Sequence, residues 1–171
     1  MSKCRVCFKP IKKFMSFGKM PIANSFIKKA KFKKQYFYNM DAGFCKNCST
    51  FQLIKVPRAK LMFNDKYAYL ASTSNFMKKH WSDLSKKIIN DLKKNKNPFV
   101  VEIGSNDGIF LENIAKKKIS HLGIDASKNV CDIAKSKGVN SLNAFFNEKT
   151  AEKIIAKYGK ADVIICTNTM H

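Results

Sequence analysis

Apolar runs and helical stripes alternate regularly through the second half of the chain. Short runs typical of buried strands begin near Phe99, His121, Ser141 and Ala161. Each of the first three runs is followed by apolar residues at helical spacing. The predicted strands lie at 99–103, 121–125, 141–144 and 161–167, and the predicted helices at 109–114, 127–137 and 148–158. Since short connections join these alternating elements, the sequence predicts an α/β fold with parallel strands, the last of them buried.

Upstream of this region the pattern is weaker. One apolar stripe includes Met77, Trp81 and Ile88, and it predicts a core-facing helix over 75–92. Residues 61–74 are polar and aromatic without a clear period. Nearer the N-terminus, the sequence predicts strands at 35–40 and 49–56 and a loop at 20–26.

Two Cys-x-x-Cys pairs, Cys4 with Cys7 and Cys45 with Cys48, enclose the N-terminal region. Paired cysteines at this spacing favour one tetrahedral Zn²⁺ ion. Two disulfides or four unrelated thiols are the alternatives, and a reducing compartment disfavours the first of these. Because cysteines would fill all four positions, the metal is expected to be structural rather than catalytic.

The loop after the 99–103 strand has the sequence Gly-Ser-Asn-Asp-Gly, residues 104–108. It is not a dinucleotide fingerprint, because Asn106 stands where the second glycine would be, and no Gly-Lys-Ser/Thr follows. Glu102 and Asp107 flank the turn, which suits a nucleoside with ammonium and sulfonium centres better than a pyrophosphate. Asp125 ends the next strand, 17 residues after Gly108, where it could accept two hydrogen bonds from ribose hydroxyls. The alternative is an ordinary βαβ unit with solvated acidic side chains.

The formal net charge of +21 raises the hypothesis of a nucleic-acid partner. However, nearly all the basic residues are lysines, with Arg5 and Arg58 as the arginines, and the lysines are spread along the chain. We therefore favour a lysine-rich composition over contact with nucleic acid or attraction of an anionic substrate. No apolar run approaches about 18 residues, and the N-terminus lacks a secretory signal, so we predict no membrane partner and a cytoplasmic location.

Taken together, the motifs resemble the N-terminal portion of the sugar C-methyltransferases, which methylate a carbon of nucleotide-linked ketosugars. The resemblance covers essentially all 171 residues. It rests on Cys4-x-x-Cys7, Pro21-Ile-Ala-Asn-Ser-Phe26, Cys45-x-x-Cys48, Tyr67-x-Tyr69-x-x-Ser72-x-Ser74 with His80, Val101-Glu-Ile-Gly-Ser-Asn-Asp-Gly108, Gly123-Ile-Asp125, Phe145-Phe146, and Ala161-Asp162 with Asn168. Family members carry a small zinc-binding domain, a Rossmann-like class I methyltransferase domain and a further C-terminal domain.

The resemblance implies S-adenosylmethionine as cofactor and a nucleotide sugar as small-molecule substrate. Gly104, Ser105 and Asn106 would line the methionine part, Asp125 would hold the ribose, and two phenylalanines would lie near the adenine. The full set implied to bind the cofactor or cover it is Glu102, Gly104, Ser105, Asn106, Asp107, Gly108, Asp125, Phe145, Phe146, Asn168, Ser72 and Ser74.

A general base is also implied, because a proton beside the sugar ketone must be removed before the carbon attacks the methyl group. The family has a histidine in an Asn-x-x-x-His pattern, which from Asn168 would fall at position 172. His171 is one residue short of it and is the candidate base, and Tyr69 is a second candidate catalytic residue.

The predicted organisation is a zinc-binding domain at 1–57, a connecting segment and helix at 58–97, and an incomplete, truncated Rossmann-like domain at 98–171. The missing C-terminal domain could be a separate chain. Two other functions remain as alternatives, namely a zinc-ribbon module that binds nucleic acid and an inactive fragment.

Overall fold

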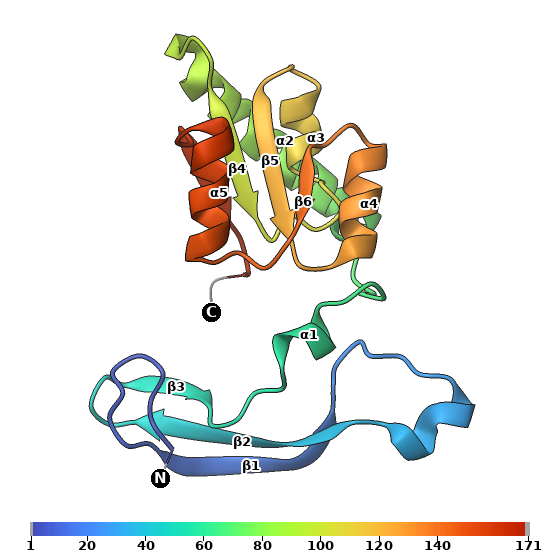
Figure 1. Ribbon diagram of the computed structural model, residues 1–171, viewed down its shortest axis with the longest axis vertical. Helices are drawn as coiled ribbons and strands as arrows, with labels where there is room; N and C mark the ends of the chain where they lie inside the picture. Colours follow the sequence, from blue (N-terminus) through green and yellow to red (C-terminus); the bar gives the residue numbers. More distant parts are fainter. Residues whose placement is uncertain (1, 170–171) are drawn as a thin grey trace. The chain divides into compact units, whose positions relative to one another are not determined.

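The computed structural model describes residues 2–169 and divides the chain into two units, residues 1–62 and residues 63–171 (Figure 1). The division after position 62 differs from the sequence-based one, because the predicted connecting segment splits between the two units. None of the helices within residues 2–169 combines the length and the apolarity needed to cross a membrane.

Unit 1, residues 1–62, is built on a three-stranded antiparallel sheet with strand order β1-β2-β3. Its elements are β1 (Lys12–Pro21), a 3-10 helix (Lys29–Lys34), β2 (Phe37–Cys45), β3 (Thr50–Leu53) and the short helix α1 (Ala59–Met62). The predicted strands at 35–40 and 49–56 correspond to β2 and β3. In contrast, β1 was not predicted, and the predicted loop at 20–26 overlaps its end. Every residue of β1 is exposed, so its sequence lacks the alternation that burial of one face imposes.

Unit 2, residues 63–171, contains a four-stranded parallel sheet with strand order β6-β5-β4-β7. Its elements are a 3-10 turn (Ala71–Thr73), α2 (Asn75–Asp91), a 3-10 turn (Leu92–Lys94), β4 (Phe99–Ile103), α3 (Leu111–Ala115), β5 (Ser120–Asp125), α4 (Lys128–Ser136), β6 (Ser141–Asn143), α5 (Glu148–Tyr158) and β7 (Val163–Cys166). The predicted α/β fold with parallel strands is confirmed.

Helices cover both faces of this sheet (Figure 1). On one face, side chains of α2, α3 and α4 pack with Val100 of β4, and Trp81 and Phe110 lie in this core. On the other face, Ile154 of α5 packs with residues of β4 and β5. The strand predicted to be buried at 161–167 lies at the edge of the described sheet as β7, and Ile164 is 62% exposed, so its predicted burial was wrong.

The parallel strands place four loops at one edge of the sheet. The loop after β4 spans residues 104–110, β5 is followed by residues 126–127, β6 by 144–147, and β7 by 167–169. Ligands of open α/β sheets bind at this carboxyl edge. The candidate site of unit 2 is therefore sought in these loops and in the segments that contact them.

Candidate functional site

Unit 1 brings its four paired cysteines together as one cluster. The sulfur atoms of Cys4, Cys7, Cys45 and Cys48 all lie within 4.8 Å of one another. The Cys4 and Cys48 sulfurs are 3.6 Å apart, and those of Cys7 and Cys45 are 3.5 Å apart. A tetrahedral zinc ion with Zn–S bonds of about 2.3 Å requires sulfur separations of roughly 3.8 Å. The cluster therefore has the size and the ligand chemistry that Zn²⁺ needs, with all four positions supplied by the chain.

Hydrogen bonds to the sulfur of Cys4 stabilise its thiolate. Hydrogen bonds from the backbone of Cys7, and then from Val6 and the Gln52 side chain, outweigh burial and lower the pKa of Cys4 to about 6. The amide nitrogen of Gln52 lies 3.1 Å from the Cys4 sulfur, and the Thr50 hydroxyl lies 3.1 Å from the Cys48 sulfur. Outer groups of this kind orient metal ligands and tune their basicity. Sequence analysis missed Gln52 and Thr50, although both lie on the strand that follows the second cysteine pair.

In unit 2, the loop after β4 contains two glycines that adopt positive φ angles. Gly104 has a φ of +73°, and a Cβ atom there would lie 2.1 Å from the hydroxyl oxygen of Thr169. Gly108 has a φ of +77°, and a Cβ atom there would lie 3.0 Å from Val139. Both conformations strongly favour glycine over residues with a side chain. The spacing of these two glycines thus has a steric reason in this chain.

Three carboxylates lie at or near the candidate site: Glu102 in β4, Asp107 in the loop after β4, and Asp125 at the end of β5. Glu102 is buried, and its pKa lies well above the usual value, first because of burial and then because of the negative charges of Asp125 and Asp107. Asp107 is fully buried, but Lys137 forms an ion pair with it. Of the three, Asp125 is therefore the partly accessible carboxylate whose charge a ligand would meet.

Asp125 is held in place by two backbone amides. Its Oδ2 accepts a hydrogen bond of 3.0 Å from the Asn106 amide, and its Oδ1 accepts one of 2.8 Å from the Ser127 amide. Burial raises the pKa of Asp125, and these amides oppose that shift. Each carboxylate oxygen keeps a lone pair for a further donor such as a ribose hydroxyl. The hydroxyl of Ser127 makes no capping bond to α4, whereas the backbone amide of this cap residue is bound by the Asp125 carboxylate.

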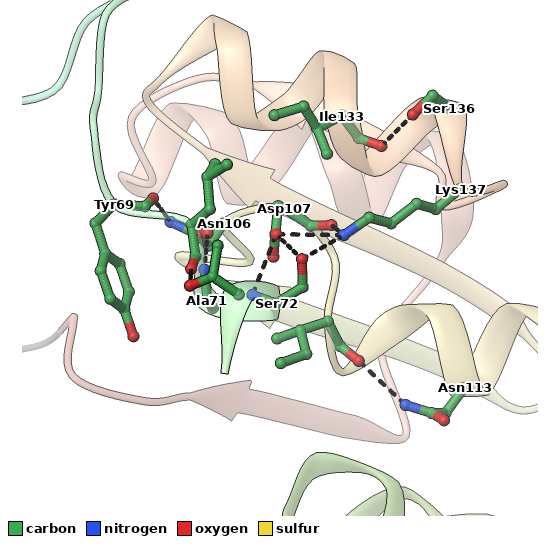
Figure 2. A network of polar contacts seen from close by, with 12 residues as sticks. Tyr69, Ala71, Ser72, Asn106, Asp107, Asn113, Ile133, Ser136 and Lys137 are labelled. Atoms are coloured by element: carbon green, nitrogen blue, oxygen red, sulfur yellow. Dashed lines mark hydrogen bonds and ion pairs between the residues drawn. The ribbon is translucent and has the colours of Figure 1, made fainter. Parts of the chain in front are cut away.

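Residues 67–74 lie against the loop and are fastened to it by hydrogen bonds (Figure 2). The Asn106 side chain accepts a hydrogen bond of 2.9 Å from the Ala71 amide and donates one of 3.1 Å to the Tyr69 carbonyl. Both the amide and the hydroxyl of Ser72 donate to Oδ2 of Asp107. We refer to residues 67–74 as the strap. The sequence offered Tyr69, Ser72 and Ser74 as candidates but gave no sign of these backbone contacts.

The other predicted site residues occupy different positions. The side chain of Ser105 is buried beside Gly123, and that of Ser74 caps α2 by accepting a hydrogen bond from the Met77 amide. Phe145 and Phe146 follow β6 and are 37% and 41% exposed. Asn168, with a φ of +53°, follows β7. Of the predicted site residues at this edge, Tyr69, Asp125, Phe145, Phe146 and Asn168 remain at least partly exposed, whereas both polar groups of the Asn106 side chain are bound to residues 69 and 71. The candidate base His171 lies outside the described residues.

The positive charge is distributed unevenly between the units. Residues 1–62 contain 15 lysines and arginines and one acidic residue, Asp41, whereas residues 63–171 contain 18 basic and 11 acidic residues. The carboxylates of the candidate site therefore lie in the less basic unit.

Comparison with known proteins agrees with the division of the chain into units 1 and 2. Residues 4–63 match the family described as "Putative zinc binding domain", and residues 101–171 match the family described as "Methyltransferase domain". The chain is 25% identical over 166 residues to the C-methyltransferase NovU of Streptomyces niveus, in a match that spans 96% of this chain and 39% of NovU.

Two solved structures of the magnesium protoporphyrin IX methyltransferase of Synechocystis PCC 6803, one with bound SAM and one with bound SAH, are also similar to the chain. Each is 16% identical with a TM-score of 0.40, in matches that cover 54% of this chain and 44% and 42% of theirs. The predicted resemblance to a C-methyltransferase with a zinc-binding domain is confirmed.

Proposed function

We propose that the chain binds S-adenosylmethionine and takes part in methylating a carbon of a nucleotide-linked ketosugar. The single observation that carries this proposal is the placement of Asp125, oriented by two amides at the end of β5, beside the glycine turn after β4. The relative NovU is itself described as a C-methyltransferase. A module that binds nucleic acid would use the charge of unit 1, but it would not need Asp125 or the glycine turn.

When bound, S-adenosylmethionine supplies an activated methyl group. Asp125 would accept hydrogen bonds from the ribose hydroxyls, and Asn106 would keep that carboxylate in position. Phe145 and Phe146 would offer apolar surface to the adenine. The acceptor carbon must lose a proton, and His171 or Tyr69 would remove it. The four cysteines would hold a structural zinc ion in a cytoplasmic, reducing environment, where thiolates persist.

Calorimetric titration of the 171-residue chain with S-adenosylmethionine tests the proposal. We expect Asp125→Asn to weaken binding roughly tenfold or more, because an amide has one acceptor oxygen and no charge for the ribose hydroxyls. Asp132→Asn is the matched control, since this exposed carboxylate on α4 forms an ion pair with Lys128. Equal affinity of wild type and Asp125→Asn would reject the site, and a folded wild-type chain that does not bind would reject cofactor binding by this chain.

A further inference from the structure

Lys137 differs from every other lysine in an ion pair of the described residues. Five of the six ion pairs join lysines whose side chains are 57–77% exposed to acidic groups that also contact solvent. The side chain of Lys137 is only 24% exposed, and the Asp107 side chain that it pairs with is 0% exposed. Surface pairs contribute little to stability, whereas a buried charge needs its partner. The position of Lys137 is therefore more constrained than that of a solvated lysine.

The ammonium group of Lys137 has three oxygen neighbours. It donates hydrogen bonds of 3.0 Å to the Ser72 hydroxyl and 2.9 Å to the Asp107 carbonyl, and it lies 3.2 Å from Oδ2 of Asp107 (Figure 2). A lysine ammonium has three N–H donors, so each donor has a partner here. One of these partners belongs to the strap and two belong to the loop. The side chain thus joins three segments that are distant in the sequence: the strap, the loop and the end of α4.

The strap has further attachments to the same loop. Asn106 bonds to the backbone of Tyr69 and Ala71, and its own amide donates to Asp125. A shift of the strap would therefore disturb the residue that orients Asp125. Asn129 provides a separate attachment, because its side chain donates a hydrogen bond of 2.8 Å to the Tyr67 carbonyl at the start of the strap.

We propose that Lys137 is a positioning residue that holds the strap on the loop and so sets the affinity of the candidate site for its cofactor. The proposal rests on the proposed function for the identity of the ligand, whereas the attachment of the strap can be tested without one. Lys137 was not among the residues that sequence analysis selected. It lies at the end of α4, next to Gly138, and resembles the many surface lysines of this chain in sequence.

The test compares Lys137→Met with Lys135→Met, a control that removes an exposed lysine from the same helix. Hydrogen exchange of the Ala71 and Ser72 amides reports on the strap, because both amides donate to loop side chains. We expect Lys137→Met to accelerate exchange at these amides and to weaken binding of S-adenosylmethionine roughly tenfold or more. Lys135→Met is expected to match the wild type in both measurements. Lys137→Arg keeps the charge and the donors and is expected to retain most of the affinity.

A second variant separates positioning from simple charge compensation. Lys137→Met leaves Asp107 without its cation, which can lower the stability of the whole unit. The double variant Lys137→Met/Asp107→Asn removes both charges and is compared with Asp107→Asn alone, because Asp107 itself accepts hydrogen bonds from Ser72. We expect the unfolding midpoint of the double variant to recover, while its strap exchange stays faster and its binding weaker than those of Asp107→Asn. Recovery of exchange and affinity together with stability would overturn the proposal. If the folded wild-type chain does not bind S-adenosylmethionine, the proposed function fails, and hydrogen exchange alone then decides whether Lys137 holds the strap.

Discussion

Removal of the metal from the four-cysteine cluster is expected to unfold unit 1 and leave unit 2 folded. The buried hydrophobic residues of unit 1, among those described, are Cys4, Ile11, Ile22, Ala42 and Cys45. Two of these are large aliphatic residues, and burying an isoleucine contributes about 1.5–3 kcal/mol, so together they supply roughly 3–6 kcal/mol. Binding of a structural zinc ion contributes about 10–16 kcal/mol to folding at neutral pH. The metal, rather than the apolar core, is therefore the largest stabilising contribution to this unit.

The two units differ in helix content, so this prediction can be measured in the intact chain. The long helices all belong to unit 2, with 17 residues in α2 and 11 in α5, whereas α1 of unit 1 has four. After treatment with a strong chelator, we expect the helical circular dichroism signal to persist while trypsin cleaves within residues 1–62. Residues 1–62 contain 15 lysines and arginines, of which only Lys9 precedes a proline that blocks trypsin, so loss of structure should produce many short fragments.

Cysteine variants complete the test. Cys45→Ser removes one ligand and is expected to abolish stable zinc binding, whereas Cys166→Ser alters a half-buried cysteine of β7 outside the cluster and should retain about one zinc per chain. If residues 1–62 stayed resistant to trypsin in a metal-free chain, the conclusion that zinc binding stabilises unit 1 more than apolar burial does would be refuted.

Two further predictions concern the candidate site of unit 2. A Cβ atom at Gly123 would lie 2.5 Å from the Ser105 hydroxyl oxygen, so Gly123→Ala should lower the free energy of unfolding by about 1–3 kcal/mol in urea titrations. Ser105→Gly should recover part of this loss, and an unchanged midpoint for Gly123→Ala would contradict the packing. Burial, and then the charges of Asp125 and Asp107, raise the pKa of Glu102 well above its usual value, so the folded state binds this proton more tightly than the unfolded state. The resulting stabilisation is full below the pKa of Glu102 in the unfolded chain and is lost as pH rises through its pKa in the folded chain. Thermal midpoints measured from about pH 4 to pH 9 should therefore fall with rising pH in wild type. They should fall less in Glu102→Gln, which has no proton to lose at this position. Parallel pH profiles would show that Glu102 does not titrate as described.

The core of unit 2 was predictable because burial leaves a clear pattern in the sequence. All five residues of β4 are buried, and they form an unbroken apolar run apart from Glu102. The predicted helix at 148–158 agrees with α5, which begins with the Asn147 cap and ends at Gly159, whose φ is +82°. Periodicity and end signals act locally, so they can be read without knowing the fold.

Other features depend on contacts that no local pattern records. β1 pairs with β2, but every residue of β1 is exposed, so its sequence follows no alternation. The strap is irregular, and its attachments join residues far apart in sequence: Ala71 and Asn106 are 35 positions apart, and Ser72 and Lys137 are 65 apart. Side chains that bond to distant backbone groups have no sequence signature, which explains why Asn106 was expected to contact a ligand and its role as an anchor was missed.

The three acidic residues of the candidate site show why a sequence motif alone overstates the negative charge that a ligand would meet. On sequence grounds, Glu102 and Asp107 favoured a ligand with positive centres, and Asp125 was expected to accept hydrogen bonds from ribose hydroxyls. In the structure, the Asp107 charge is offset by Lys137 and used to hold Ser72, and burial favours the protonated form of Glu102. Asp125 alone remains both oriented and partly accessible. Under the proposed function, recognition of a cationic nucleoside at this edge would depend chiefly on hydrogen bonds that Asp125 accepts, which is why its amide variant is the most informative single substitution in the chain.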